Sequence, residues 1–353
     1  MGFNAYRRTR QRGVAVVTAL LLTTLAVTIV ASLFWQQQVQ VRSIENQRLQ
    51  LQKQWILRGA LDWARLILRE NARLSSQYDS LDQPWAVPLQ DTRLDQYLEN
   101  NRADTESSDA TLSGGMVDAQ SMYNLNNLAA NGVKVDKEVS VFARLLGSLR
   151  LNPSLAQDAA VMIAASTAKQ NLAAGTVNPP AQTLDPTTGL PLVQSGSTSG
   201  SQTPAPAQPP AVVVPSGPPM LAMTQVEDLL AVPGFTPEAV EKLRNLVIFL
   251  PQTGTQININ TASAEVLTAV MENGSASDAA FIVAARTTAS FRQGDPRLDQ
   301  IKTFSTGNFG FRSNYFLVNG KVKLNRAALQ IQAMISRSAQ SPFKTQVIWT
   351  REN

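Results

Sequence analysis

The chain has 353 residues, which is long enough for two domains, and 44% of them are apolar, which is enough to form buried cores. It contains no cysteine and no histidine, so disulfides, thiolate metal sites, the usual zinc ligand and the usual general base are excluded. Of the formal net charge of +5, four units come from Arg7, Arg8, Arg10 and Arg12, so we expect no basic nucleic-acid face and no enzyme, although carboxylate or lysine chemistry stays open.

The first predicted element is an apolar helix at residues 14–35, VAVVTALLLTTLAVTIVASLFW, which contains no charge, proline or glycine. At about 1.5 Å per residue it spans the roughly 30 Å hydrocarbon core of a membrane. The preceding arginines should stay cytoplasmic, which places the rest of the chain beyond the membrane. An ordinary secretory signal fits poorly, because its apolar region is only about 7–15 residues long.

The same helix is predicted to continue well beyond the membrane. No proline occurs between Val14 and Gln83, and the only glycine there is Gly59. Apolar residues recur at three-, four- and seven-residue steps, as on an amphipathic face: Val41, Ile44, Leu51, Trp55, Ile56, Trp63 and Ile67. We therefore expect one helix of about 60 residues, half in the membrane and half packed on a soluble domain.

A plain single-pass anchor would explain the helix alone, but the join before it is distinctive. An acid-free, arginine-rich leader ends in Arg12-Gly13, and the apolar run starts at once. With the stretches QRGVAVVTALLL, FWQQQVQVRSIEN and GALDWARLIL, the chain resembles type IV pilin-like proteins, and within them the general secretion pathway protein K family. The resemblance implies cleavage by prepilin peptidase between Gly13 and Val14, with Val14 as an N-methylated mature terminus.

The fifth residue after this junction is Thr18, where most pilins carry glutamate. In pilins that carboxylate neutralises the terminal amine of a neighbouring subunit inside the lipid, where an unpaired charge costs several kcal/mol. Loss of the glutamate is known in the protein K family. The resemblance therefore implies that Thr18 marks a subunit at the tip of a filament, although a tolerated small residue would look the same.

An acidic run from Asp91 to Asp109 follows, and it could offer oxygen ligands to a divalent metal such as calcium. It has no D-x-D-x-D-G loop, so a solvated face is the better interpretation and no cofactor or metal ligand is assigned. Next comes a strand leading into a turn, with a signature similar to one in the protein K family. We expect a structural role for it, with asparagine amides capping backbone: Asp118, Asn124, Leu125, Asn126 and Leu128.

Helical patterns cover residues 137–149 and 153–171. Residues 172–219 are rich in Pro, Gly, Ser, Thr and Gln and are expected to form a disordered surface loop. Two helical hairpins, 224–250 and 257–289, then look like a tandem repeat, since Glu227-Asp-Leu-Leu-Ala-Val recurs as Glu265-Val-Leu-Thr-Ala-Val. Thr261 is expected to be the N-cap of a helix with Glu265 in its first turn.

Both hairpins resemble helix-hairpin-helix motifs, which in nucleic-acid-binding proteins hold a phosphate on turn N–H groups. Here the turns carry carboxylates, which would repel a duplex: Glu238, Glu241, Glu272 and Asp278. A membrane-tethered nucleic-acid-binding protein therefore remains only an alternative. The hairpins are a known feature of the protein K family, where they belong to an inserted helical domain.

From Asn314 onward the pattern changes to strands. Asn319-Gly320 signals either a two-residue hairpin or a bulge in one longer strand. Leu329, Ile331, Ala333 and Ile335 alternate with smaller or polar residues, and the run 343–351 closes an antiparallel sheet of about three strands. The second half of the long helix is the expected cover for one face of this sheet.

These elements predict an α+β, pilin-like fold with a large inserted all-helical domain. Its expected parts are a leader (1–13), the long helix (14–75), a first part of the core (76–125), the inserted domain (126–304) and C-terminal strands (305–353). The resemblance implies a minor pseudopilin that starts and caps a periplasmic pseudopilus of type II secretion. Its implied partners are minor pseudopilins I and J, pseudopilin H and the major pseudopilin below them, and the inner-membrane assembly platform. A minor pilin of a type IV pilus is the closest alternative.

Overall fold

The structure is a computed structural model that describes residues 12–75, 77–93, 111–173, 221–272, 274–300, 308–324, 327–338 and 340–352. Residues 1–11 of the predicted leader lie outside these ranges. So do most of the acidic run and the predicted loop from residue 174 onward.

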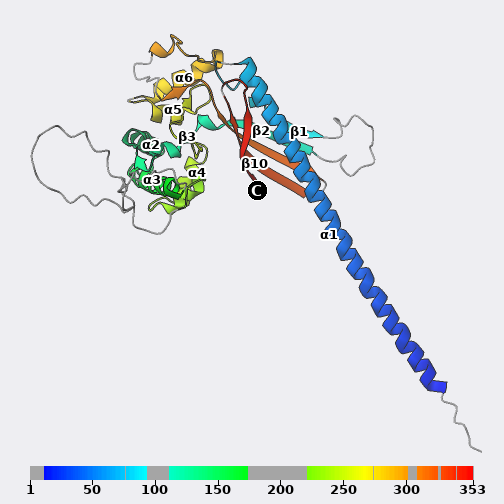
Figure 1. Cartoon of the computed structure of the whole chain (residues 1–353). Coiled ribbons are helices and arrows are strands. Elements are labelled where there is room, and N and C mark those ends of the chain that lie inside the picture. Colours follow the sequence, from blue (N-terminus) through cyan, green and yellow to red (C-terminus); the bar gives the residue numbers. More distant parts are fainter. Residues whose placement is uncertain are drawn as a thin grey trace, which may run out of the picture.

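One helix, α1 (Arg12–Leu74), runs for 63 residues without a break, as the uninterrupted pattern predicted. It contains an apolar window long enough to cross a membrane, and none of that window is buried. This half projects away from the rest of the molecule, while the other half lies along the sheet (Figure 1). The chain leaves the helix at Ser75, whose N–H still donates to the carbonyl of Asn71 at 2.8 Å.

An antiparallel sheet of five strands, in the order β1-β2-β9-β10-β11, lies against α1. The three C-terminal strands agree with the prediction, but the expected total of about three was too low, because β1 and β2 join them from earlier in the chain. The bounds are β1 (Leu89–Arg93), β2 (Thr111–Asp118), β9 (Tyr315–Leu324), β10 (Ala327–Arg337) and β11 (Thr345–Glu352). Both outer pairs contain a register shift, between Leu89 and Thr92 in β1 and opposite Met334/Ile335 in β11.

Asn319-Gly320 forms neither a hairpin nor a bulge, but the one longer strand of the second prediction is present. The strand β9 passes straight through it, with Gly320 opposite Ile331 on one side and Gly114 on the other. Pairing on both sides overrides the local turn signal. Glycine is needed instead for close packing, since a Cβ at Gly320 would lie 3.2 Å from Ile331 and 3.4 Å from Leu57 of α1.

The core between α1 and the sheet is built from the two predicted periodicities. Helix residues spaced by three or four meet strand residues spaced by two. Trp85, in the short 3-10 helix η1 (Pro84–Ala86), closes one side edge-on to Phe316, with ring centroids 5.1 Å apart. The buried members are Leu57, Leu61, Ala64, Leu68, Trp85, Phe316, Val318, Val322, Leu329, Ile331, Ala333 and Ile335.

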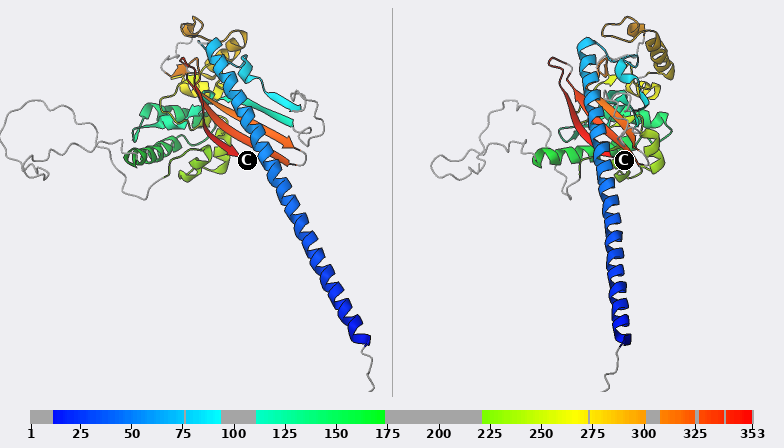
Figure 2. Two further views of the ribbon diagram at one scale, coloured as in Figure 1. Left: turned by 45° about the vertical axis from the view of Figure 1, so that its right-hand side comes forward. Right: turned by 90° about the vertical axis from the view of Figure 1, so that its right-hand side faces the viewer.

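A helical unit with its own, larger core lies on the other side of the sheet from α1 (Figure 2). It is inserted between β2 and β9, and its first two α-helices are α2 (Asp136–Ser148) and α3 (Leu155–Ala173), the longest described helix of the insert. The other helices are η4 (Ala119–Ser121), η5 (Leu125–Leu128), η6 (Val226–Ala231), α4 (Pro237–Leu243), α5 (Ala264–Val270), α6 (Ala276–Thr288) and η7 (Leu298–Gln300). Its strand pairs are β3 (Tyr123–Asn124) with β6 (Val247–Ile248), β4 (Ala129–Ala130) with β5 (Val133–Lys134), and β7 (Ile257–Asn258) with β8 (Phe309–Gly310).

The insert is joined to the sheet by a small apolar cluster on the face that α1 leaves open. Ile248 and Leu250 of the insert pack there with Tyr315 and Met334 of the sheet. The parallel pair β3–β6 joins the entry of the insert to its middle, and the parallel pair β7–β8 joins its middle to its exit. Core and insert therefore share buried contacts as well as chain connections.

Two details of the predicted hairpins differ from the expectation. Thr261 is not an N-cap: α5 begins at Ala264, and Ser263 caps it by accepting from the N–H of Val266. Thr261 is drawn away by a buried contact described below. The two similar runs also differ, since residues 226–231 form a 3-10 helix whereas 264–270 form an α-helix. Glu265 does lie in the first turn of α5.

Candidate functional site

The membrane-length part of α1 carries the predicted processing junction and Thr18. Because α1 begins at Arg12, the Gly13–Val14 bond lies in its first turn. The Thr18 hydroxyl contacts its own helix, at 3.0 Å from the carbonyl of Val14 and 3.1 Å from that of Ala15. Its one donor is thus satisfied without water or a partner, which suits a lipid environment. Thr18 itself supplies a hydroxyl where most pilins supply a carboxylate.

Beyond the membrane-length part, α1 has a second apolar face that points away from the sheet. Trp55 is 69% exposed and Trp63 is 51% exposed, while Leu57 and Leu61 are buried. Residues two positions apart on a helix point in nearly opposite directions, so Trp55 faces outward. Trp63 lies at the edge of this face, where it also lines an apolar groove between α1 and β2. We call this face the outward stripe; it consists of Val41, Ile44, Leu51, Trp55, Trp63 and Leu66, all of them exposed.

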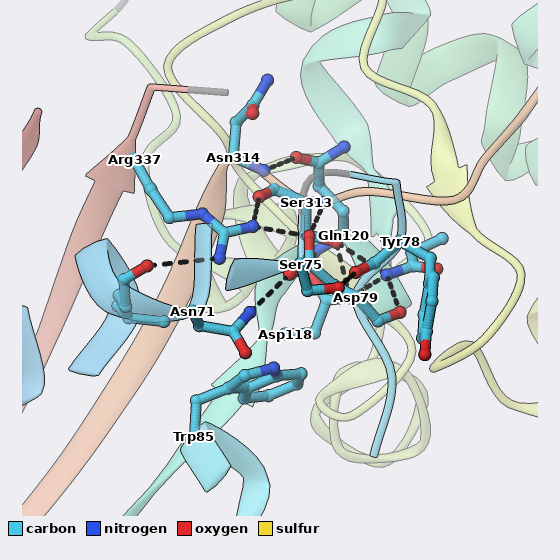
Figure 3. Close-up of polar contacts among 12 residues, drawn as sticks. Asn71, Ser75, Tyr78, Asp79, Trp85, Asp118, Gln120, Ser313, Asn314 and Arg337 are labelled. Atoms are coloured by element: carbon cyan, nitrogen blue, oxygen red, sulfur yellow. Dashed lines mark hydrogen bonds and ion pairs between the residues drawn. The ribbon is translucent and has the colours of Figure 1, made fainter. Parts of the chain in front are cut away.

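Asp118, from the predicted signature, is a buried hub between core and insert (Figure 3). Its Oδ1 accepts from the N–H of Gln120 at 2.8 Å, which caps η4. Its Oδ2 accepts from Asn258 at 2.9 Å and from the hydroxyls of Thr261 and Ser313, each at 2.6 Å. Burial raises the pKa of the Asp118 carboxyl, against these hydrogen bonds, which lower it.

A second buried carboxylate, Asp79, lies on the other side of Ser313. It accepts from the Ser313 N–H at 2.8 Å and from Asn71 of α1 at 3.0 Å. Its cation is Arg337, at 2.5 Å, and neither side chain of this pair is exposed to solvent. Arg337 also donates to the carbonyl of Ser313 and lies over the ring of Phe316. One arginine thus ties the end of β10 to the segment that follows α1.

The asparagines of the signature cap backbone, as expected. The Asn124 carbonyl accepts from the N–H groups of Asn126 and Leu250, both at 3.0 Å, and its amide donates to the carbonyl of Gln252 at 2.8 Å. Asn126 donates to the carbonyl of Leu250 at 2.7 Å. Leu125 and Leu128 are fully buried. The signature therefore joins the start of the insert, at Asn124 and Asn126, to the segment 250–252 in its middle.

The hairpin turns are used for internal packing. Gly234, in the first turn, has φ of +95°, and a Cβ there would lie 2.7 Å from Leu155 at the start of α3. In the second turn, Ser275 caps α6 by accepting from the N–H of Asp278 at 3.2 Å, and the Asp278 carboxylate accepts in return from the N–H of Ser275 at 3.0 Å. Glu238, Glu241 and Glu272 are exposed. Within the described ranges, no three His, Cys, Asp or Glu residues come together as metal ligands.

Sequence reasoning missed two residues that donate to Asp118, namely Asn258 and Ser313, and it missed the neighbouring buried pair of Asp79 and Arg337. Only Arg337 left a signal. It is the next odd-numbered residue after Leu329, Ile331, Ala333 and Ile335, so the alternation places it on the buried face, where an arginine requires a carboxylate. Asp79 is separated from it by 258 residues, and no local pattern connects them.

Comparison with known proteins agrees with this architecture. Residues 121–252 and residues 257–302 match two family models, both described as type II secretion system (T2SS), protein K, and together they cover about half of the chain. The chain is also similar to a chain of the GspK–GspI–GspJ complex of the type 2 secretion system from enterotoxigenic Escherichia coli. The TM-score is 0.52 and the identity 22%, over 88% of this chain and 99% of that one, which shows a shared fold. No curated protein matches.

Proposed function

Because this chain belongs to the protein K family of the type II secretion system, we propose that it starts and caps the tip of the periplasmic pseudopilus. It is a minor pseudopilin, a structural subunit and not an enzyme. The likeness to a chain of the GspK–GspI–GspJ complex supports minor pseudopilins I and J as its direct neighbours. Pseudopilin H, the major pseudopilin and the inner-membrane assembly platform follow as partners below the tip.

One observation carries this proposal: α1 has two apolar stretches that the chain itself leaves uncovered. The membrane-length window is unburied, and the outward stripe continues the apolar surface past it. Exposed apolar surface of this length is unusual for a monomer and marks a contact with lipid or with other helices. A subunit held by its helix in a bundle of similar helices would bury both stretches.

Co-purification tests the proposed tip complex. The full chain, carrying an affinity tag at its C-terminus, is expressed with pseudopilins I and J, and the membranes are solubilised in mild detergent. We expect a stoichiometric complex that survives gel filtration. The matched control replaces the chain with a tagged single-pass anchor of the same length, which should recover neither partner. If the tagged chain recovers neither partner either, the tip assignment is wrong.

Processing at Gly13–Val14 is a further part of the proposal. Cleavage there would leave the whole apolar helix on the mature chain, with the arginine-rich leader on the cytoplasmic side and residues beyond about 35 in the periplasm. Mass spectrometry of the mature protein should find an N-methylated Val14 terminus in cells with prepilin peptidase. In cells without that enzyme the chain should begin at Met1. A start at Met1 in both would contradict this assignment.

Thr18 is proposed to suit the tip, because its hydroxyl is already bonded within α1 and offers no charge to an amine ahead of it. The insert, proposed to span 126–304 between core segments 76–125 and 305–353, would block further subunits by its bulk. We propose that hairpins 224–250 and 257–289 are helix-hairpin-helix-like units that serve this scaffold. The carboxylates in their turns support a role without nucleic acid.

A further inference from the structure

The outward stripe contains one position where a neighbour can approach the backbone of α1 closely. Gly59 lies one helical turn from Trp55 on one side and from Trp63 on the other, at about 6 Å along the axis. A Cβ at Gly59 would meet nothing within 4 Å. Both tryptophans are more than half exposed. The two rings therefore border an open notch floored by a glycine, which we call the Gly59 notch.

The shape and position of the notch favour another helix. The outward stripe and the membrane-length window lie on the same straight helix, α1. An element that covers both must therefore run beside α1 for tens of ångströms. Small residues at a helix surface let two backbones come close, and flanking large side chains then pack around the incoming knob. A loop or a strand would cover the notch but not the length of the stripe.

Charge selects among possible helices. Residues 36–74 contain seven Lys or Arg against three Asp or Glu. Two of those acids are already paired within α1, Asp62 with Arg65 and Glu70 with Arg73, both at 2.8 Å. Arg48 is exposed in the stripe, between Ile44 and Leu51, and has no ion pair among the described residues. A second copy of this chain would bring the same positive excess against it.

We propose that the Gly59 notch seats an apolar side chain of a parallel helix from a different subunit, and that this helix carries a carboxylate at the height of Arg48. The inference rests on the proposed function, because it takes a neighbour in the tip complex as the partner. It adds which face of α1 is used, where the closest approach lies, and why the partner is not a second copy. Burying two tryptophans makes the notch the expected centre of the contact.

The test uses the full chain co-expressed with pseudopilins I and J in membranes. Since the chain has no cysteine, Gly59→Cys introduces a unique thiol, and single cysteines are scanned along the apolar helix of each partner. We expect disulfides between position 59 and a few partner positions spaced by three or four residues. Gln54→Cys, exposed in the same region but off the stripe, is the matched control and should form none. Equal crosslinking from both positions, or crosslinks only between copies of this chain, would overturn the proposal.

Two substitutions test the notch and the charge without a thiol. Gly59→Leu fills the notch and should weaken recovery of the partner roughly tenfold, whereas Gly59→Ala should have little effect and keeps the helix intact. Arg48→Glu should weaken recovery and be rescued by Arg or Lys at the partner's acidic position. If the unsubstituted chain recovers no partner, the proposed function fails. If it does, and Gly59→Leu and Arg48→Glu match it, only the notch is wrong.

Discussion

Thr261 donates its hydroxyl to Asp118 at 2.6 Å across 143 residues of sequence, so a threonine of the insert is bonded to the end of β2. Asn258 and Ser313 donate to the same oxygen. This carboxylate, at the end of β2, thus accepts hydrogen bonds from residues that lie between β2 and β9. The insert is therefore oriented on the core by polar groups that satisfy one another, and only partly by apolar packing.

Replacing Asp118 is expected to be costly. Asp118→Ala leaves four donors without their acceptor, each in a buried position, and should lower the free energy of unfolding by on the order of 3 kcal/mol or more. Thr261→Val removes only one of these bonds and should cost about 1 kcal/mol. Urea unfolding of the detergent-solubilised chain, followed by tryptophan fluorescence, measures both. Asp91→Ala, at an exposed pair with Lys323, is the control and should leave the midpoint unchanged.

Asp118 should also give stability a defined dependence on pH. Burial raises the pKa of its carboxyl above the ordinary value of 3.8, so the folded chain binds this proton more tightly than the unfolded chain does. Its contribution to the free energy of unfolding is then full below the unfolded pKa and is lost as pH rises through the folded one. The stability of the unsubstituted chain minus that of Asp118→Asn should shrink as pH rises from 4. A difference that grows instead would mean that the four donors outweigh burial.

The buried pair of Arg337 and Asp79 leads to a third expectation. Arg337→Met strands the Asp79 carboxylate without its cation and should cost about 3–5 kcal/mol. Adding Asp79→Asn to that variant should recover part of the loss, because the remaining group is then neutral. Thermal or urea unfolding gives the cycle. Arg73→Met, which breaks an exposed ion pair on α1, serves as the control. If it lowers the free energy of unfolding as much as Arg337→Met does, the prediction that burial makes the Arg337–Asp79 pair costly to break is wrong.

Adjacent glycines in β2 provide a matched pair of substitutions. A Cβ at Gly114 would lie 2.2 Å from the carbonyl oxygen of Asn319, whereas a Cβ at Gly115 would lie 3.5 Å from Pro88, an ordinary contact. Gly114→Ala should therefore displace β9 and lower the free energy of unfolding by about 1–3 kcal/mol. Gly115→Ala should be close to neutral. Equal unfolding midpoints for the two variants would contradict the close approach of β9 to Gly114.

The long helix and the strand alternation were predictable because they depend on neighbours within a few residues. Sixty residues without proline favour one helix, and period-two apolar residues favour strands. Where a local sequence pattern conflicted with pairing to a distant part of the chain, the distant pairing determined the structure. Asn319-Gly320 suggested a turn, yet pairing with both β2 and β10 keeps the chain extended.

The cap of α5 shows the same limit at the level of single side chains. The stretch from Asn258 to Ser263 offers several residues able to cap a helix, and sequence alone does not rank them. The Thr261 hydroxyl donates to Asp118, and Ser263 is the residue that caps α5. The Arg337–Asp79 pair lay beyond reach for a related reason, because burial of one member was foreseeable and the identity of the other was not.

The irregular outer strands of the sheet have a consequence for how such a subunit grows into an assembly. A straight free edge would accept a strand from any passing chain, and both edges here are interrupted by a register shift. Pairing of these sheets edge to edge is thereby discouraged. Contact between subunits is then left to the exposed apolar surface of α1, which favours arrangement along one helix axis.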